Sequence, residues 1–279
     1  MIAPPVSREM LLHVVKVLPA APQILAHLGR LLLDMNSGLN DVTELLRRDA
    51  GLTARIIRVA NSSVYNPGVP SSSLVEALAR VGFKEVYRLT GFAAVAQIAD
   101  QKLPLYGVTG AQLRENSLLT ALVMEGLAPT AGVDPRLAYT AGLLRSTGRI
   151  ALDRMLRDDA AGHRFAGDTM PLAEWEVRLA GLHNCSAAAI ILGEWRFPEE
   201  MIAGIRDHYL LEGSATRLAN LLNLAAGEAE RAGHGLPGET AYWSPDPGKL
   251  TAAGVSAEEL QEVTGRAVQT FETLRKVVS

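Results

Sequence analysis

The sequence predicts an all-α protein, and three observations lead to that fold class. Alanine and leucine are abundant and recur at helical spacing, aromatic residues make up only 5% of the chain, and no segment shows sustained alternation of β-branched residues. Apolar residues that recur every three to four positions are typical of amphipathic helices, whereas half-buried strands need a period of two.

Composition narrows the class of protein further. The 279 residues are 48% hydrophobic and 20% charged, which is typical of a globular chain with one large domain or two small ones. The 27 Lys and Arg residues nearly balance the 30 Asp and Glu residues, so the net charge of −3 argues against a nucleic-acid partner. The single cysteine, Cys185, forbids an internal disulfide and fits a reducing compartment.

Neither an export signal nor a membrane span stands out. The first nine residues hold two prolines and a charged pair, and the longest apolar stretches, such as 92–96, fall far short of a span. A membrane helix needs about 20 apolar residues. We therefore expect a cytoplasmic protein without a membrane partner.

In the first third of the chain, apolar faces and capping residues predict a series of helices. Ser7 is a suitable N-cap for a first helix, and the segment Pro19–Pro22 breaks it. After a turn at 36–38, Asn40 is expected to cap a helix whose acids precede its arginines, as the helix dipole favours. The helices predicted after the first include Ile24–Leu32, Asp41–Arg48, Leu52–Ala60, Leu74–Val81 and Lys84–Ala99.

The segment Lys102–Gly110 is rich in glycine and proline and is the best candidate for a boundary between two halves. Beyond it, Asp134 before Pro135 starts a helix, and Ser256 with Glu259 matches a capping box for the last one. Loops are expected over 158–168 and 233–248. The other predicted helices are Ala111–Ala128, Leu172–Gly181, Ser186–Trp195, Pro198–Leu210 and Ser214–Ala232, and the last helix ends near Lys276.

Five segments carry a resemblance to a known family. They are Leu18–Pro22, Arg48–Ser62 with Tyr65 after it, Ser72–Gly82, Ala141–Arg149, and Trp195–Pro198 followed by Ile205–Tyr209. In this order they resemble the HDOD family, a signalling-associated branch of the HD superfamily of metal-dependent phosphohydrolases, although Ala50 stands where proline is usual. The resemblance implies a two-lobed helical unit, with an N-terminal bundle over residues 1–103 and an HD-like lobe over residues 104–279.

The signature Ala60-Asn61-Ser62 within these segments is interpreted as structural. Asparagine tolerates the left-handed conformation common at helix ends, so we expect a fixed helix exit and a satisfied polar turn. Neither Asn61 nor Ser62 has an adjacent base that would activate it for catalysis.

The resemblance also locates the metal site of active HD enzymes, and this chain departs from it at most positions. Such enzymes hold a divalent ion with histidines and aspartates, and the ion activates a water that attacks phosphorus. Here Asn116 takes the first His position, Arg145 and Ser146 replace the His-Asp pair, and Tyr209 replaces one His of a later pair. Only His183 and His208 are retained.

Because arginine is always protonated and repels a dication, we expect no metal, no cofactor and no hydrolase activity. Two readings of the altered site stay open. Arg145 can form a salt bridge with an acid such as Glu115 or Asp207 and fill the old cavity, which is the favoured reading. Alternatively, a pocket accepts an anion or nucleotide. That pocket is lined by Asn116, Arg145, His183 and His208.

Tyr242 and Trp243 form an aromatic pair in the loop predicted over 233–248. If it is exposed, the pair offers a contact point for another protein. The favoured alternative is that it anchors this loop onto the helical bundle.

The favoured functional hypothesis is a non-catalytic regulatory or scaffold protein of bacterial signal transduction. The resemblance implies partners among signalling proteins, such as cyclic-dinucleotide enzymes or kinases. The alternatives are a nucleotide or anion sensor at the altered HD site and a metal-dependent phosphohydrolase.

Overall fold

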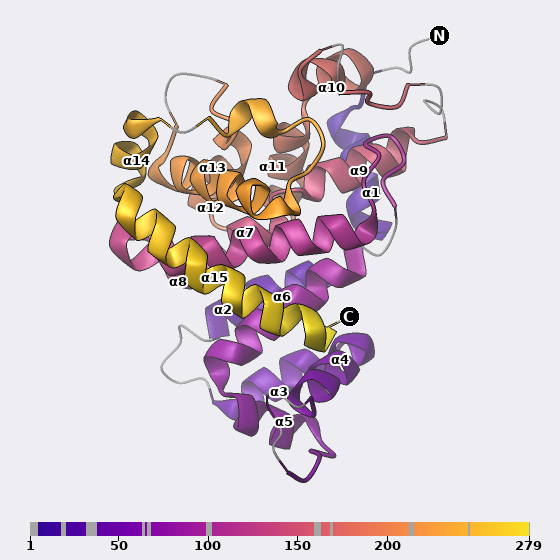
Figure 1. The fold of residues 1–279 in the computed structure, drawn as a ribbon. Helices are drawn as coiled ribbons and strands as arrows, with labels where there is room; N and C mark the ends of the chain where they lie inside the picture. The colour runs from indigo at the N-terminus through magenta and orange to yellow at the C-terminus, as the bar shows by residue number, and fades with distance from the viewer. Residues whose placement is uncertain are drawn as a thin grey trace.

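The computed structural model describes residues 5–17, 21–31, 38–62, 65, 68–98, 102–158, 163–167, 170–211, 215–244 and 246–278. Within these ranges the chain forms helices and no β-strand, and one isolated bridge joins Leu103 to Val108. The predicted all-α class is therefore confirmed (Figure 1). Among the described helices, none combines the length and the apolar character of a membrane span.

A lower lobe is built by five helices that follow the first one (Figure 1). They pack against one another around leucine and isoleucine side chains that are fully buried, such as Leu28, Leu46 and Ile56. Their bounds are α2 Ala21–Leu31, α3 Leu39–Arg47, α4 Ala50–Ala60, α5 Leu74–Val81 and α6 Phe83–Ile98.

Two helix starts in this lobe differ from the predictions. The N-cap of α3 is Gly38 rather than Asn40, because the Asp41 carboxylate accepts the Gly38 N–H at 2.7 Å. Helix α4 begins two residues before Leu52, because the Asp49 carboxylate accepts the Leu52 N–H at 2.8 Å and caps the preceding turn. Predicted features at 18–20, 36–37 and Ala99 lie outside the described residues.

Asn61 fixes the end of α4, as its structural role predicts, but it does so with its side chain and not with a left-handed backbone. Its φ of −92° is not left-handed. Instead, its side chain accepts the Ser71 N–H at 2.7 Å and donates to the Ser71 carbonyl at 2.8 Å. These two bonds tie the end of α4 to the chain just before α5.

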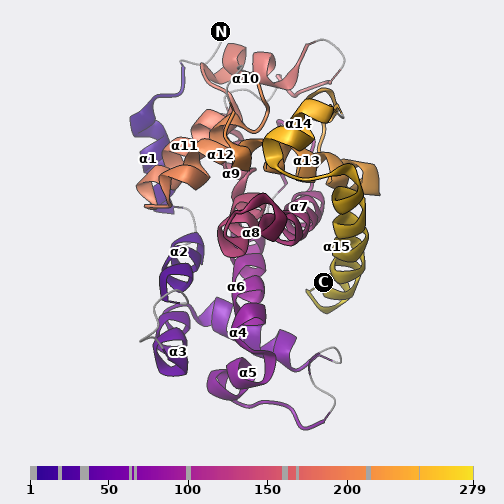
Figure 2. The ribbon, with the colours of Figure 1, turned by 90° about the vertical axis from the view of Figure 1, so that its left-hand side faces the viewer.

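The first helix, α1 (Arg8–Val17), does not lie with the lower lobe. It packs against α11 and α9 of the upper lobe (Figure 2), and the Val6 N–H donates to the Ala180 carbonyl at 2.7 Å. Helix α1 therefore packs with the upper lobe, although it lies within the residues 1–103 that were predicted as the N-terminal bundle. The reason is its apolar face: Leu11, Val14 and Val15 are buried against the C-terminal half of the chain.

The upper lobe surrounds α7, which contacts α8, α13 and α15 (Figure 1). Its helices are α7 Gly110–Ala131, α8 Pro135–Leu144, α9 Thr147–Leu156, α10 Leu172–Ala180, α11 Asn184–Glu194, α12 Glu199–Asp207, α13 Arg217–Ala229, α14 Pro247–Ala253 and α15 Ala257–Val278. Asp134 caps α8 with Pro135 in its first turn, and Ser256 and Glu259 form the predicted capping box of α15.

The segment predicted as a loop over 233–248 has more structure than expected. A π-helical turn, Glu230–His234, extends α13 and is kinked at Gly233, whose φ of 87° favours glycine. A 3₁₀ turn, Thr240–Tyr242, follows. These turns direct the segment back across the upper lobe, where it covers the centre described below.

Helix α6 joins the two lobes through specific contacts. Arg88 of α6 donates to Glu125 of α7 at 2.7 Å, and the Tyr139 hydroxyl of α8 donates to the Arg88 carbonyl at 3.0 Å. At Gly91 a Cβ would lie 2.6 Å from Leu143 Cδ1, so α6 and α8 approach as closely as they do because Gly91 has no side chain.

Candidate functional site: a buried arginine–glutamate centre

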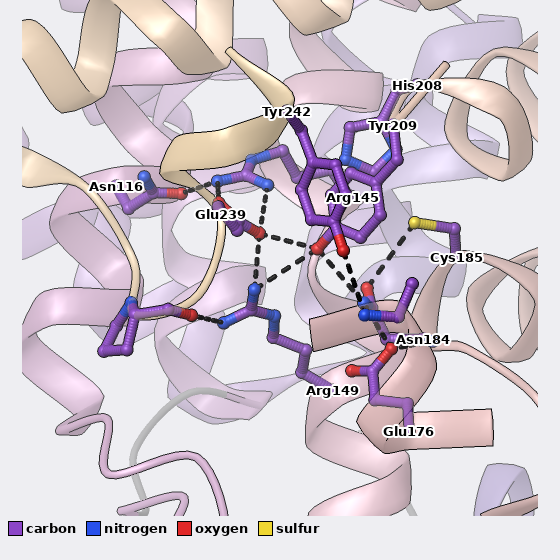
Figure 3. Close-up of polar contacts among 12 residues, drawn as sticks. Asn116, Arg145, Arg149, Glu176, Asn184, Cys185, His208, Tyr209, Glu239 and Tyr242 are labelled. Carbon is purple, nitrogen blue, oxygen red and sulfur yellow. Dashed lines mark hydrogen bonds and ion pairs between the residues drawn. The ribbon is translucent and has the colours of Figure 1, made fainter. Parts of the chain in front are cut away.

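Several of the polar residues predicted for the altered HD site meet inside the upper lobe (Figure 3). Asn116 comes from the N-terminal half of α7, Arg145 follows the end of α8, and His208 and Tyr209 follow the end of α12. The chain turns sharply between α8 and α9 immediately after Arg145, and the Arg145 side chain is 1% exposed.

The close packing around this turn depends on a glycine. At Gly148, in the first turn of α9, a Cβ would lie 1.8 Å from the Asn184 carbonyl oxygen of α11. Only glycine allows α9 and α11 to approach this closely. The family segment 141–149 therefore fixes the backbone on which Arg145 and Arg149 stand.

Glu239 lies at the middle of the centre and is 1% exposed. Its carboxylate accepts two hydrogen bonds from Arg145, both at 2.9 Å, one from Arg149 at 2.7 Å and one from the Tyr209 hydroxyl at 2.8 Å. The Arg145 contact is bidentate, the strongest geometry for a guanidinium and a carboxylate. We refer to Arg145, Arg149, Tyr209 and Glu239 as the arginine–glutamate centre.

Asn116 connects this centre to the turn that follows α13. Its Oδ1 accepts a hydrogen bond from Arg145 at 2.6 Å, and its Nδ2 donates to the His234 carbonyl at 2.7 Å. The residue at the position of the first metal-binding His therefore orients a guanidinium. It does so with the same amide that holds the π-helical turn in place.

A second buried carboxylate, Glu176 of α10, extends the network on the other side. It accepts the Asn184 N–H at 2.7 Å and the Asn184 Nδ2–H at 3.0 Å, and Asn184 also donates to the Tyr209 hydroxyl at 3.1 Å. With Glu176 ionised, two arginines and two glutamates balance each other inside the lobe. A buried cluster of this kind is tolerated because its charges are paired and hydrogen-bonded.

The pKa values of the acidic groups follow from burial and from these partners. Burial alone would raise the pKa of Glu239, but Arg145 and Arg149 lower it to about 2. Burial also raises the pKa of Glu176, and Arg149 only partly opposes that shift. Burial would lower the pKa of Arg149, but Glu239 raises it. The centre therefore holds a charged Glu239 throughout the physiological pH range.

His208, the second retained histidine, is fully buried beside the centre. Burial and the positive charge of Arg145 lower its pKa to about 3, so the imidazole is neutral at pH 7. Its Nδ1 lies 2.6 Å from the Ile205 carbonyl oxygen, an acceptor, so Nδ1 carries the proton. Among the described residues, Nε2 has no hydrogen-bond partner.

The structure does not bring every predicted site residue to the centre. His183 is the N-cap of α11, where its ring accepts from the Ser186 N–H, and it belongs to none of the hydrogen bonds that hold Glu239. The acids predicted as partners of Arg145 are engaged elsewhere. Glu115 lies 3.2 Å from His234, and Asp207 pairs with Arg206 at 2.7 Å. Arg145 thus forms a buried salt bridge, as predicted, but its acidic partner is Glu239 and not Glu115 or Asp207.

The aromatic pair Tyr242-Trp243 packs over the centre. Trp243 is buried, with the Arg145 guanidinium 5.6 Å from its ring centroid, and the Tyr242 ring stacks on Tyr209 at 4.2 Å. The Tyr242 hydroxyl accepts the Ala173 N–H at 2.9 Å. This arrangement anchors the segment onto the bundle, as the favoured reading expected, and leaves little of Trp243 to serve as a contact point for another protein.

The side chains at the centre do not suit a divalent metal ion. Active HD sites use imidazoles and carboxylates, whereas here two guanidinium groups surround the carboxylate of Glu239. In the part of the chain that the structure describes, no three His, Cys, Asp or Glu residues are arranged to hold a metal ion. The arrangement neutralises buried charge, and its hydrogen bonds connect α7, the ends of α8 and α12, and α9 to the segment that carries Glu239.

Comparison with known proteins agrees with this architecture. The HDOD domain family matches residues 18–211. A crystal structure of an HDOD domain protein from Geobacter sulfurreducens has a TM-score of 0.68 at 20% identity, covering 97% of this chain and 96% of the other. A search among curated protein sequences returned no match.

Two further crystal structures share the fold at similar identity. A protein from Shewanella amazonensis SB2B, named as a candidate phosphohydrolase, has a TM-score of 0.62 at 22% identity and covers 97% of this chain and 98% of that one. A protein from Marinobacter aquaeolei VT8, named as a candidate signal transduction protein, has a TM-score of 0.66 at 20% identity. The match covers 94% of this chain and 58% of that one.

Proposed function

This chain belongs to the HDOD domain family, and we propose that it is a non-catalytic regulatory or scaffold protein of bacterial signal transduction. It acts in the cytoplasm through contacts with other signalling proteins. The observation that carries the proposal is the arginine–glutamate centre, because paired guanidinium and carboxylate groups occupy the interior where an HD enzyme would need its metal ligands.

Metal-dependent hydrolysis is the less favoured alternative on physical grounds. A catalytic dication must be held by several neutral imidazoles or carboxylates, and Arg145 places a permanent positive charge among the candidate ligands. For Glu239 to bind a metal, it would have to give up hydrogen bonds to two arginines and to Tyr209. Both arginines would then remain buried without a counter-charge.

Nucleotide or anion sensing at the same centre also receives less support. Arg145, the group that would bind an anion, is 1% exposed, and among the described residues it donates its hydrogen bonds to Glu239 and Asn116. An entering phosphate would have to displace a carboxylate that already forms a bidentate pair. His183, proposed to line this pocket, caps α11 instead.

The proposed partners are cyclic-dinucleotide enzymes or kinases, and two paired measurements test the proposal. The tagged full-length chain is expressed in its native bacterium at its own level, cross-linked and captured. The recovered signalling enzyme is then purified and assayed with and without the full-length chain. We expect its activity to change in proportion to the amount of complex.

The second measurement addresses hydrolysis directly. Hydrolysis of bis(p-nitrophenyl) phosphate is followed with Mn²⁺, Fe²⁺ or Mg²⁺ present, using the wild type and the H208N variant. We expect both proteins to match the buffer. Turnover that scales with protein concentration and disappears in H208N would show that the chain is an enzyme and would overturn the proposal.

A further inference from the structure

A groove lies where the lower lobe meets the upper lobe, away from the arginine–glutamate centre. It has a volume of about 460 Å³ and is enclosed by α2, α6, α8 and the segment 196–201 at the start of α12. None of the four residues proposed for the altered HD site lines it. Volumes of this size are typical of small-molecule sites, which often form between domains.

The floor of the groove is apolar. Leu25 of α2, Tyr87 of α6 and Met201 of α12 line it, and each is almost fully buried within its own lobe or between the lobes. Gly29 of α2 leaves part of the space open, since a Cβ there would already lie 3.4 Å from the Tyr87 hydroxyl. The floor therefore suits an apolar group of a ligand.

The hydroxyl groups at the floor are paired with each other. Thr140 donates to the Arg136 carbonyl at 2.8 Å, so its oxygen accepts from the Tyr87 hydroxyl at 2.6 Å. Both hydroxyl protons are used inside the protein. The floor therefore has no hydroxyl proton to donate to a ligand, and a polar group of the ligand must be bound by residues of the rim.

The rim carries two arginines and one aspartate, Arg136, Arg196 and Asp134. Asp134 caps α8 through two backbone N–H groups at 2.7 and 3.1 Å and lies 3.8 Å from Arg136 Nε. Arg196 is exposed, and no ion pair joins it to any residue that the structure describes. The rim therefore presents a net positive charge, with Arg196 as its accessible group.

The backbone supports a specific placement of Arg196. Its φ of 59° is left-handed, a conformation that is unfavourable for a non-glycine residue. The conformation belongs to the end of α11, where the Arg196 N–H donates to the Gly193 carbonyl at 3.0 Å and the Phe197 N–H donates to the Leu192 carbonyl at 3.1 Å. Here the left-handed turn after α11 sets Arg196 between Trp195, which is buried, and Phe197, which lines the groove.

We propose that this interlobe groove binds a small amphipathic anion. The apolar body of the ligand rests on Leu25, Tyr87 and Met201, and its carboxylate or phosphate pairs with Arg196. The ligand contacts α2 and α6 from one lobe and α8 and α12 from the other. The inference does not depend on the proposed function, because binding is measured on the isolated full-length chain.

The test uses anilinonaphthalene sulfonate as the probe, because it joins an aromatic body to an anionic group. We expect one site per folded chain, with displacement by decanoate and by decyl phosphate and much weaker displacement by decanol. The two anionic competitors distinguish a carboxylate ligand from a phosphate ligand. Because Arg196 is exposed and water screens its ion pair with the ligand, R196Q should weaken probe binding by about two- to fivefold.

Three further variants control the assay. A26W and L137W each place a large ring in the groove from a different lobe, so at least one folded variant is expected and should lose the site. R47Q removes an exposed arginine of α3 and should leave binding unchanged. Folding of each variant is checked by its thermal transition, since the probe also binds partly unfolded chains.

The binding measurements on these variants either support or overturn the proposed site. Loss of the site in a folded tryptophan variant together with weaker binding in R196Q supports the proposal. Probe binding that survives in folded A26W or L137W would place the site elsewhere and overturn it. Displacement by decanol as strong as by decanoate would overturn the assignment of an anionic ligand.

Discussion

Replacement of Glu239 by glutamine is the sharpest test of the arginine–glutamate centre. E239Q preserves the size and shape of the side chain but removes its negative charge. The amide nitrogen, placed at either oxygen position, faces a guanidinium N–H that can only donate, and Arg145 and Arg149 both lose their counter-charge. R145M removes the other side of the pair but leaves Glu239 with Arg149 and Tyr209.

The two substitutions should therefore differ in magnitude. Removing one partner of a buried ion pair destabilises a protein by about 3–5 kcal/mol, and we expect E239Q to fall in that range. R145M leaves Glu239 bonded to Arg149 and Tyr209, and Glu176, whose pKa burial already raises, can take up a proton to remove the excess negative charge. R145M should therefore cost about 1–3 kcal/mol, close to the loss of a few buried hydrogen bonds. The double variant R145M/E239Q should cost less than the sum, because the two residues are in direct contact.

Urea unfolding followed by far-ultraviolet circular dichroism measures these free energies. E194Q, an exposed glutamate of α11, is the matched control and should change the free energy of unfolding by less than about 0.5 kcal/mol. A cost below about 1 kcal/mol for E239Q, or a larger cost for R145M than for E239Q, would refute the central place of Glu239 in this cluster.

Three other predictions follow from buried groups. His208 is protonated near pH 6.5 in the unfolded chain but only near pH 3 in the folded chain, so the free energy of unfolding should fall as the pH drops below about 6.5. This group contributes up to about 1.4 kcal/mol per pH unit. H208N should flatten that slope in urea unfolding at pH 4–7. Burial raises the pKa of Asp153 to about 6, so ionisation of this carboxyl lowers the stability of the fold as the pH rises from about 4 to about 6. D153N should therefore raise the Tm at pH 8 but not at pH 4. An equal change in Tm at both pH values would contradict this. G148A should prevent folding or cost more than about 3 kcal/mol, because the added Cβ meets the backbone of Asn184. G265A places its Cβ in open space on α15 and should be neutral or stabilising by up to about 1 kcal/mol. Chemical denaturation of the two variants measures this difference.

Much of the fold could be predicted from local sequence patterns. Asp134 before Pro135, and Ser256 with Glu259, are signals that act within one helical turn, and the structure contains both caps. The start of α3 was harder to predict, because Gly38, which has no side chain to cap with, competes with Asn40. The Asp41 carboxylate decides that competition by reaching back to the Gly38 N–H.

The place of α1 could not be read from its own sequence. An amphipathic face predicts that a helix is buried on one side, but it does not identify what covers that side. Here α11 and α9, more than 100 residues further along the chain, cover it. Contacts of such separation are decided by the global fold.

The centre itself was only half predictable. Because Arg145 stands at the position of a buried metal ligand, the sequence predicts that a buried acid neutralises it. Glu239, however, is separated from Arg145 by 94 residues and lies in a segment rich in glycine and proline. Acids in such segments are usually solvent-exposed. The nearby Tyr242, which stacks on Tyr209, was the one sequence signal that this segment packs on the core.

The most direct measurement of the central claim is anomalous diffraction from a crystal of the full-length protein grown with Mn²⁺. We expect Arg145 and Arg149 to remain within hydrogen-bond distance of Glu239, with no manganese peak beside Asn116, Arg145 or His208. A manganese peak at those residues, with Glu239 turned away from the arginines, would contradict it.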